Sequence, residues 1–103
     1  MKTHKEIIAQ HRAEIDHVDA ELLRLLHHRA RLASKLLALK RAAGLPICDP
    51  QRELEVLTRV CESSNGPLAK EAIIAIFQRI VEETRKAEER EAQAEMAAEG
   101  SSL

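Results

Sequence analysis

Eight polar residues that could do chemistry lie on or beside the apolar faces of this chain. They are Arg12, Arg29, Lys40, Asp49, Arg52, Glu53, Thr84 and Glu88. Four of the eight are cations, and the sequence shows no paired Ser and His, no metal-ligand cluster and no glycine-rich loop. Arginine is suited to binding carboxylates with two parallel hydrogen bonds. The set therefore predicts a site that holds a small polyanion, although each cation taken alone also fits a surface ion pair.

The spacing of three of these cations along a helix predicts which of them face the same site. At about 100° per residue, the step from Arg29 to Lys40 returns to within about 20° of one direction, roughly 16 Å further along a helix. Arg12 lies about 80 to 100° away from both directions. We expect Arg29 and Lys40 to face one cavity, and Arg12 to reach the site of a partner chain.

One long helix is expected to carry these cations. Residues 5–43 contain neither Gly nor Pro, and at about 1.5 Å per residue they span roughly 58 Å. A compact domain of 103 residues has a diameter of only about 33 Å, so this helix protrudes from a monomeric globule. Its apolar residues recur every three or four positions: Ile8, Ile15, Val18, Leu22, Leu25, Leu26, Leu32, Ala33, Leu36 and Leu39. A second copy of the chain is expected to cover them.

Two further helices complete the predicted fold. Gly44 ends the first helix in a left-handed cap, and Asp49 followed by Pro50 is typical of a helix start, so a second helix runs to about residue 62. Residues 63–67 break that helix, and a third begins at residues 67–69. The chain is thus predicted to be all-α, with long, short and long helices in an intertwined helical-bundle homodimer. We expect a single domain over residues 1–98 and a disordered tail over residues 99–103.

Composition argues against several classes of protein. Phe77 is the only aromatic residue, so bases have almost nothing to stack on, and 16 Lys and Arg against 17 Asp and Glu leave no basic face for nucleic acid. Cys48 and Cys61 lack the spacing of a zinc site. No apolar run approaches the roughly 20 residues of a membrane span, and the N-terminus lacks the apolar core of a signal peptide. We expect a cytoplasmic protein with no metal, no nucleic acid and no membrane partner.

Two segments of the chain, taken together, resemble a known family. They are HRAEIDHVDAELLRLLHHRARLASKLLALKRAAGLPICDPQRELEVL and FQRIVEETRKAE. Both resemble the all-helical class of chorismate mutases, whose pattern has an early Arg before Ile-Asp-x-x-Asp, then Leu-Leu-x-Leu-Leu, a second Arg, a Lys, and Pro-x-x-Asp-x-x-Arg-Glu. The resemblance covers roughly residues 7–88.

This resemblance implies a role for each polar residue. Arg29 and, from the partner chain, Arg12 would bind the two carboxylates of chorismate. Lys40 would contact a carboxylate and the ether oxygen of the breaking bond. Arg52 matches an arginine near the ring carboxylate, and Glu53 matches the glutamate that accepts the substrate's hydroxyl.

The remaining three residues include one departure from the family pattern. Asp49 lies beside the glutamate, and Thr84 stands where bacterial members usually have Ser, which keeps a hydroxyl. Glu88 stands where many bacterial members have Gln. A carboxyl group can donate to the ether oxygen only when it is protonated, so this exchange bears on the pH dependence of the reaction.

The implied reaction suits a site built from cations. Conversion of chorismate to prephenate, a step in phenylalanine and tyrosine biosynthesis, is an intramolecular rearrangement without proton transfer or covalent intermediate. The protein needs only to select the folded conformer and to stabilise the charge that builds on the ether oxygen. Lys40 and a protonated Glu88 would meet that charge, and one such donor is typically worth about 3 kcal/mol. No cofactor is implied.

Two other functions remain open on the same residues. Isochorismate pyruvate lyases share the fold and the cationic site, but they carry a loop lysine where this chain has GLPICD over residues 44–49. A noncatalytic helical dimerisation or regulatory module would keep the bundle without turnover. The cationic set argues against that module, because a scaffold gains nothing from desolvating charges.

Overall fold

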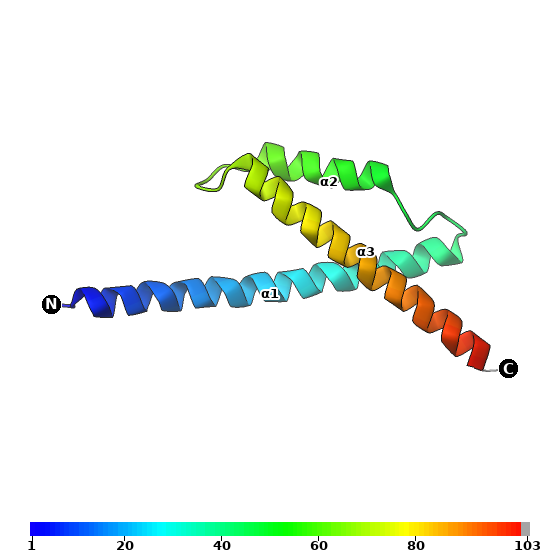
Figure 1. Cartoon of the computed structure of the whole chain (residues 1–103), viewed down its shortest axis with the longest axis horizontal. Helices are drawn as coiled ribbons and strands as arrows, with labels where there is room; N and C mark the ends of the chain where they lie inside the picture. The colour runs from blue at the N-terminus through cyan, green and yellow to red at the C-terminus, as the bar shows by residue number, and fades with distance from the viewer. Residues whose placement is uncertain (102–103) are drawn as a thin grey trace. The chain divides into compact units, whose positions relative to one another are not determined.

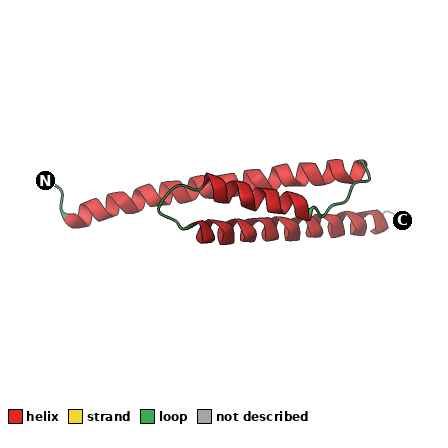
Figure 2. Cartoon of the chain, turned by 90° about the horizontal axis from the view of Figure 1, so that it is seen from above, coloured by secondary structure: helices red, strands yellow, loops and turns green. Residues whose placement is uncertain are grey.

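The structure is a computed structural model that describes residues 1–101 of the chain. It contains α1 (His4–Ala42), α2 (Pro50–Ser63) and α3 (Lys70–Ser101), labelled in Figure 1. Figure 2 shows that the rest of the described chain is loop and that these residues form no strand. The predicted all-α class and the long, short and long order of helices are confirmed.

The chain divides into two compact units, Met1–Leu32 and Ala33–Leu103. The first unit consists of the larger part of α1 and the residues before it. Its apolar side chains are exposed, with Ile15 60% and Leu22 53% accessible. The others that share this exposure are Ile8, Val18, Leu23, Leu25, Leu26 and Leu32. An apolar surface of this length is typical of a protein–protein contact.

Packing of α2 against α3 gives the second unit its apolar interior. The half-buried residues that form it are Val56, Leu57, Val60, Ile73, Phe77, Ile80 and Val81. They recur at the three- and four-residue spacing of helix faces. Leu54 and Ile76, which the apolar pattern also offered for burial, remain exposed because they lie to the side of these two faces.

The last turns of α1 also belong to the second unit, and they contact α3. Leu37 is only 3% exposed, and it is the one buried apolar residue in the described part of the chain. The hydroxyl of Ser34 donates a hydrogen bond of 2.6 Å to Oε1 of Glu91, and Arg41 forms an ion pair with Glu95. The end of α1 is therefore fastened to the C-terminal half of α3.

Local capping fixes where α1 ends and where α2 begins. Gly44 has a φ of 69°, and the amide of Leu45 donates to the carbonyl of Lys40 at 2.8 Å, as in a Schellman cap. Asp49 caps α2, since its Oδ1 accepts the amide of Arg52 at 3.1 Å with Pro50 in the first turn. Both predicted caps are confirmed, and they define the connection over residues 43–49.

The third helix differs at both ends from the expectation. It begins at Lys70, with the amide of Ile73 bonded to the carbonyl of Ala69 at 3.1 Å. It continues through Ser101, so three residues of the tail expected over 99–103 are helical and the last two lie outside the described residues. The Ala- and Glu-rich sequence favours helix strongly enough to offset the cost of about 1 kcal/mol at Gly100.

Candidate active site

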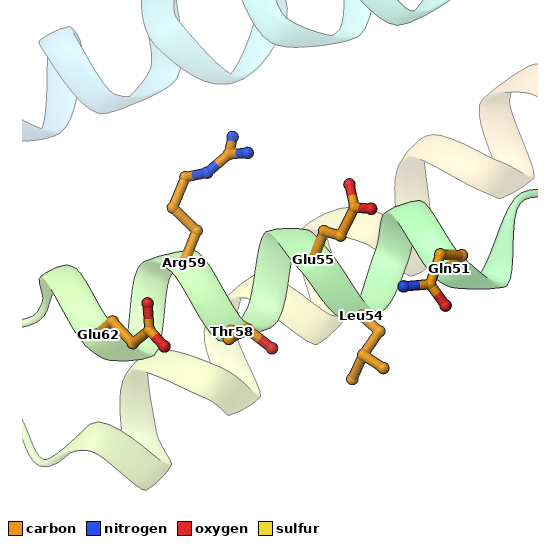
Figure 3. A pocket seen from close by; sticks show the side chains of 6 residues that line it. All are labelled: Gln51, Leu54, Glu55, Thr58, Arg59 and Glu62. Atoms are coloured by element: carbon orange, nitrogen blue, oxygen red, sulfur yellow. The ribbon is translucent and has the colours of Figure 1, made fainter.

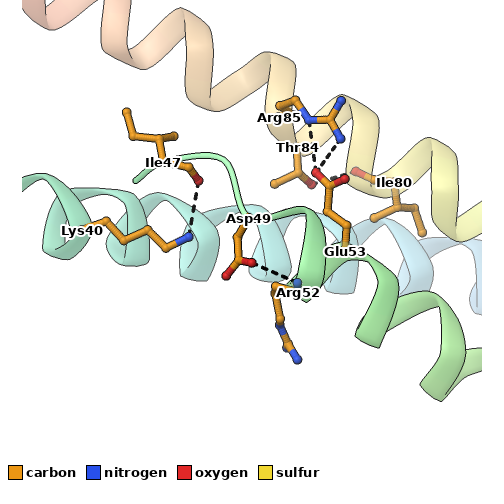
Figure 4. A network of polar contacts seen from close by, with 8 residues as sticks. All are labelled: Lys40, Ile47, Asp49, Arg52, Glu53, Ile80, Thr84 and Arg85. Carbon is orange, nitrogen blue, oxygen red and sulfur yellow. Dashed lines mark hydrogen bonds and ion pairs between the residues drawn. The ribbon is translucent and has the colours of Figure 1, made fainter. Parts of the chain in front are cut away.

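Four of the predicted site residues lie together in the second unit: Lys40, Asp49, Glu53 and Thr84 (Figure 4). The ammonium of Lys40, at the end of α1, donates to the carbonyl of Ile47 at 3.4 Å. Ile47 is two residues from Asp49, and Asp49 is one turn before Glu53. The hydrogen bond to Ile47 thus places the ammonium group of Lys40 beside the connection that leads to the start of α2.

Glu53 lies on the face of α2 that packs against α3. It precedes Val56, Leu57 and Val60 at helical spacing, and like them it is half-buried. Its carboxylate pairs with Arg85 of α3, whose Nε and Nη2 donate to Oε1 at 3.2 and 2.5 Å (Figure 4). Both hydrogen bonds of this ion pair end on one oxygen, and neither ends on Oε2.

Arg85 is a residue of this site that the sequence analysis missed. The charges around it, Glu82, Glu83 and Lys86, form ion pairs within α3, and the sequence pattern suggests the same for Arg85. Its partner is instead 32 residues away on another helix. The side-chain hydrogen bond with Glu53 raises the pKa of Arg85 above its ordinary value, which favours the charged form of an already strongly basic group.

Thr84 and Glu88 lie one turn apart on α3, and both are half-buried. The Thr84 hydroxyl donates to the carbonyl of Ile80 at 2.8 Å, a bond within the helix. To donate to a carboxylate, Thr84 would have to rotate away from Ile80.

The polar atoms of Asp49 and Arg52 lie in different directions and have different partners. Oδ1 of Asp49 is engaged in capping α2. The Arg52 guanidinium extends away from Asp49 and Glu53 in Figure 4, and it lies 3.7 Å from Glu55 of its own helix. A role for Arg52 in binding a carboxylate therefore requires a change of its side-chain conformation, which an exposed arginine makes readily.

Arg12 and Arg29 lie on α1 in the first unit. Arg12 is exposed, and Arg29 is half-buried. Arg12 is next to His11, which with Glu14, Ile15 and Val18 lines an open hollow of about 330 Å³. This hollow is bounded by one helix alone, so a second surface is needed to close it.

A second open hollow, of about 360 Å³, lies along α2 (Figure 3). Its lining residues are Gln51, Leu54, Glu55, Thr58, Arg59 and Glu62, and it includes none of the eight predicted residues. Within residues 1–101, no group of three or more His, Cys, Asp or Glu side chains could hold a metal ion.

Comparison with known proteins shows which family this sequence matches. Residues 11–89 match the family described as chorismate mutase type II. All eight predicted site residues fall inside that match. None of the described helices is long and apolar enough to cross a membrane.

Individual relatives agree with the family match. A chorismate mutase of Methanocaldococcus jannaschii is 33% identical over 81 residues, which cover 78% of this chain and 82% of that protein. A bifunctional chorismate mutase/prephenate dehydratase of Aquifex aeolicus is 38% identical over 74% of this chain, but this chain spans only 22% of that protein. A solved chorismate mutase structure from Thermus thermophilus is 38% identical, with a TM-score of 0.77 over 81% of this chain and 94% of the other.

Proposed function

Because this chain belongs to the type II chorismate mutase family, we propose that it converts chorismate to prephenate in phenylalanine and tyrosine biosynthesis. The observation that carries the proposal is the family match over residues 11–89, which includes every predicted site residue. The likeness to the Thermus thermophilus enzyme supports it, since that chain is matched over 94% of its length.

The charges of the second unit suit this reaction. Lys40 supplies a cation, and its ammonium group forms a long hydrogen bond, 3.4 Å, to the neutral carbonyl of Ile47. A carboxylate or a developing ether oxyanion is a better partner for an ammonium group than a carbonyl, because the hydrogen bond is then charge-assisted. A ligand that brings such an oxygen can therefore draw Lys40 away from Ile47.

Glu53 takes a different part in the proposed mechanism. Its carboxylate is an acceptor only, which suits a ligand hydroxyl and does not suit the carboxylates of chorismate. Arg85 offsets the charge of Glu53 at 3.2 Å, which lessens its repulsion of a dianionic substrate. In this proposal Arg29 and Arg12 bind the two carboxylates, and Glu88 in its protonated form donates to the ether oxygen beside Lys40.

A homodimer is part of the same proposal. The first unit exposes an apolar stripe in which Ile15, Val18 and Leu22 are each more than half accessible. A second copy of the chain that lies along this stripe would bury it, and each buried leucine or isoleucine would contribute about 2 kcal/mol. Arg12, which is exposed on the same helix, would then complete the partner's site.

The proposed function is tested by measuring which of two substrates the protein converts. Purified protein is mixed with chorismate or with isochorismate, and the disappearance of each is followed together with the formation of prephenate or of pyruvate. We expect turnover of chorismate to prephenate. Release of pyruvate from isochorismate alone would assign the chain to the lyase reaction, and no turnover of either by folded dimer would indicate a noncatalytic module.

A further inference from the structure

The Glu53–Arg85 ion pair has features that stability does not explain. The Glu53 side chain is 31% exposed and the Arg85 side chain 46% exposed, so solvent screens their attraction. Ion pairs with this exposure contribute little to folding. The pair nevertheless joins two helices, and it fixes the carboxylate that the proposed function assigns to the substrate's hydroxyl.

The geometry of the pair leaves one carboxylate oxygen for a ligand. Nε and Nη2 of Arg85 both donate to Oε1 of Glu53, instead of bonding one to each oxygen as in a bidentate arrangement. An unrestrained glutamate side chain on a helix surface samples several rotamers. The two bonds to Oε1 favour the orientation of Glu53 seen here, in which Oε2 can accept a hydrogen bond.

Arg85 itself is next to Thr84 and one turn before Glu88 and Glu89 on α3. An arginine is cationic throughout the physiological pH range, and the hydrogen bond with Glu53 raises the pKa of Arg85 further. It therefore acts on Glu53 as a permanent donor and counter-charge.

We infer that Arg85 is a positioning residue, which orients Glu53 so that Oε2 accepts the hydroxyl of the substrate. This inference rests on the proposed function, because that function supplies the hydroxyl. The contact is made equally well before and during the rearrangement, since charge builds on the ether oxygen and not on the hydroxyl. Removing Arg85 should therefore raise KM and leave kcat nearly unchanged.

The experiment is a double-mutant cycle on the full chain with Arg85→Ala, Glu53→Ala and the double variant. We expect Arg85→Ala to raise KM for chorismate about tenfold, the size of one charge-assisted hydrogen bond. In the Glu53→Ala background the same change should alter KM less than about twofold, because Arg85 acts through Glu53. Arg85→Lys, which keeps the charge and one donor, should recover part of the affinity.

Arg79→Ala is the matched control. Arg79 is an arginine of the same helix whose ion pairs with Glu82 and Glu83 are local, and its side chain is 67% exposed. It should leave KM unchanged. Circular dichroism melting of each variant shows whether an effect on KM accompanies a loss of structure.

Three results would overturn the inference. An unchanged KM in Arg85→Ala would show that Glu53 needs no restraint, and an equal rise of KM in the Glu53→Ala background would show that Arg85 contacts the substrate itself. The third result is a large drop in the melting temperature of Arg85→Ala, together with a return of KM to the wild-type value when a second substitution restores folding. This would show that Arg85 has a structural role alone.

Binding of prephenate, measured by calorimetry on the same variants, separates this inference from the proposed function. If the wild type binds prephenate without turning over chorismate, the proposed function fails. The Kd values of prephenate for the variants of the double-mutant cycle then still test whether Arg85 acts through Glu53. If the wild type neither turns over chorismate nor binds prephenate, both are overturned.

Discussion

Lys40, in the last turn of α1, donates a hydrogen bond to the carbonyl of Ile47, which lies seven residues further along in the connection to α2. At 3.4 Å this bond is longer than the usual 2.7–3.2 Å of an amine donor, so it is weak. The ammonium group is held near the start of α2 and can still be recruited by a stronger acceptor. A lysine poised in this way suits a ligand that arrives with its own negative charge.

Lys40→Met, which removes the donor and keeps the length of the side chain, should reduce kcat for chorismate by about 10² to 10³, the usual loss for one donor to a developing oxyanion. KM should change less, because the charge on the ether oxygen exists only in the transition state. Steady-state kinetics with chorismate measure both values. Lys70→Met, at the exposed start of α3, is the matched control and should behave as the wild type. Equal losses in the two variants would show that Lys40 takes no part in the reaction.

The chain should be an obligate dimer. Sedimentation at low micromolar concentration should give a single species of about twice 11.5 kDa. Ile15→Glu combined with Leu22→Glu should produce an inactive monomer, because an unpaired buried carboxylate costs several kcal/mol. Glu21→Gln on the same helix should leave the dimer intact. A folded, active monomer of the wild type would contradict the shared site.

Arg12 should act in the site of the partner chain. Arg12→Ala and Arg29→Ala should each abolish most activity as homodimers. Unfolding and refolding a mixture of the two should recover activity, since each heterodimer has one site with Arg12 from one chain and Arg29 from the other. Refolded Arg12→Ala alone is the control. Verified heterodimers without recovered activity would place both arginines in one chain's site.

Glu88 should make turnover pH-dependent. The carboxyl can donate to the ether oxygen only in its protonated form, and its anion would repel the charge that develops there. Activity should therefore be highest on the acidic side and fall as pH rises and Glu88 ionises. Glu88→Gln keeps a donor at every pH, so it should flatten the profile of kcat between pH 5 and 9 and retain activity at pH 8. Superimposable profiles would show that Glu88 does not face the ether oxygen.

Several features of the fold could be predicted because they depend on neighbouring residues in the sequence. The left-handed conformation of Gly44 and the cap that Asp49 provides for α2 are settled by contacts three to five residues away. The extent of α1 follows from the same local rules, since it lacks Gly and Pro from His4 to Ala42. The placement of Glu53 on the packed face of α2 also follows, because Val56, Leu57 and Val60 continue its stripe.

The end of α3 was harder to predict from sequence. Its Ala- and Glu-rich last turns have little to bury, yet Glu91 and Glu95 reach Ser34 and Arg41 at the end of α1. These contacts join residues more than 50 positions apart, and a local pattern carries no information about them.

By itself, the sequence determined the three helices and the caps at Gly44 and Asp49, because helical periodicity and capping act over a few residues. It also supplied the set of polar residues from which the polyanion site is predicted. Only the tertiary structure decided which of those charges meet. The packing of α2 against α3 pairs Arg85 with Glu53, whereas Arg52 turns toward Glu55. Both arginines carry the same charge, and both lie near carboxylates in the sequence. The orientation of two packed helix faces selects between them, and that selection depends on contacts distant in sequence.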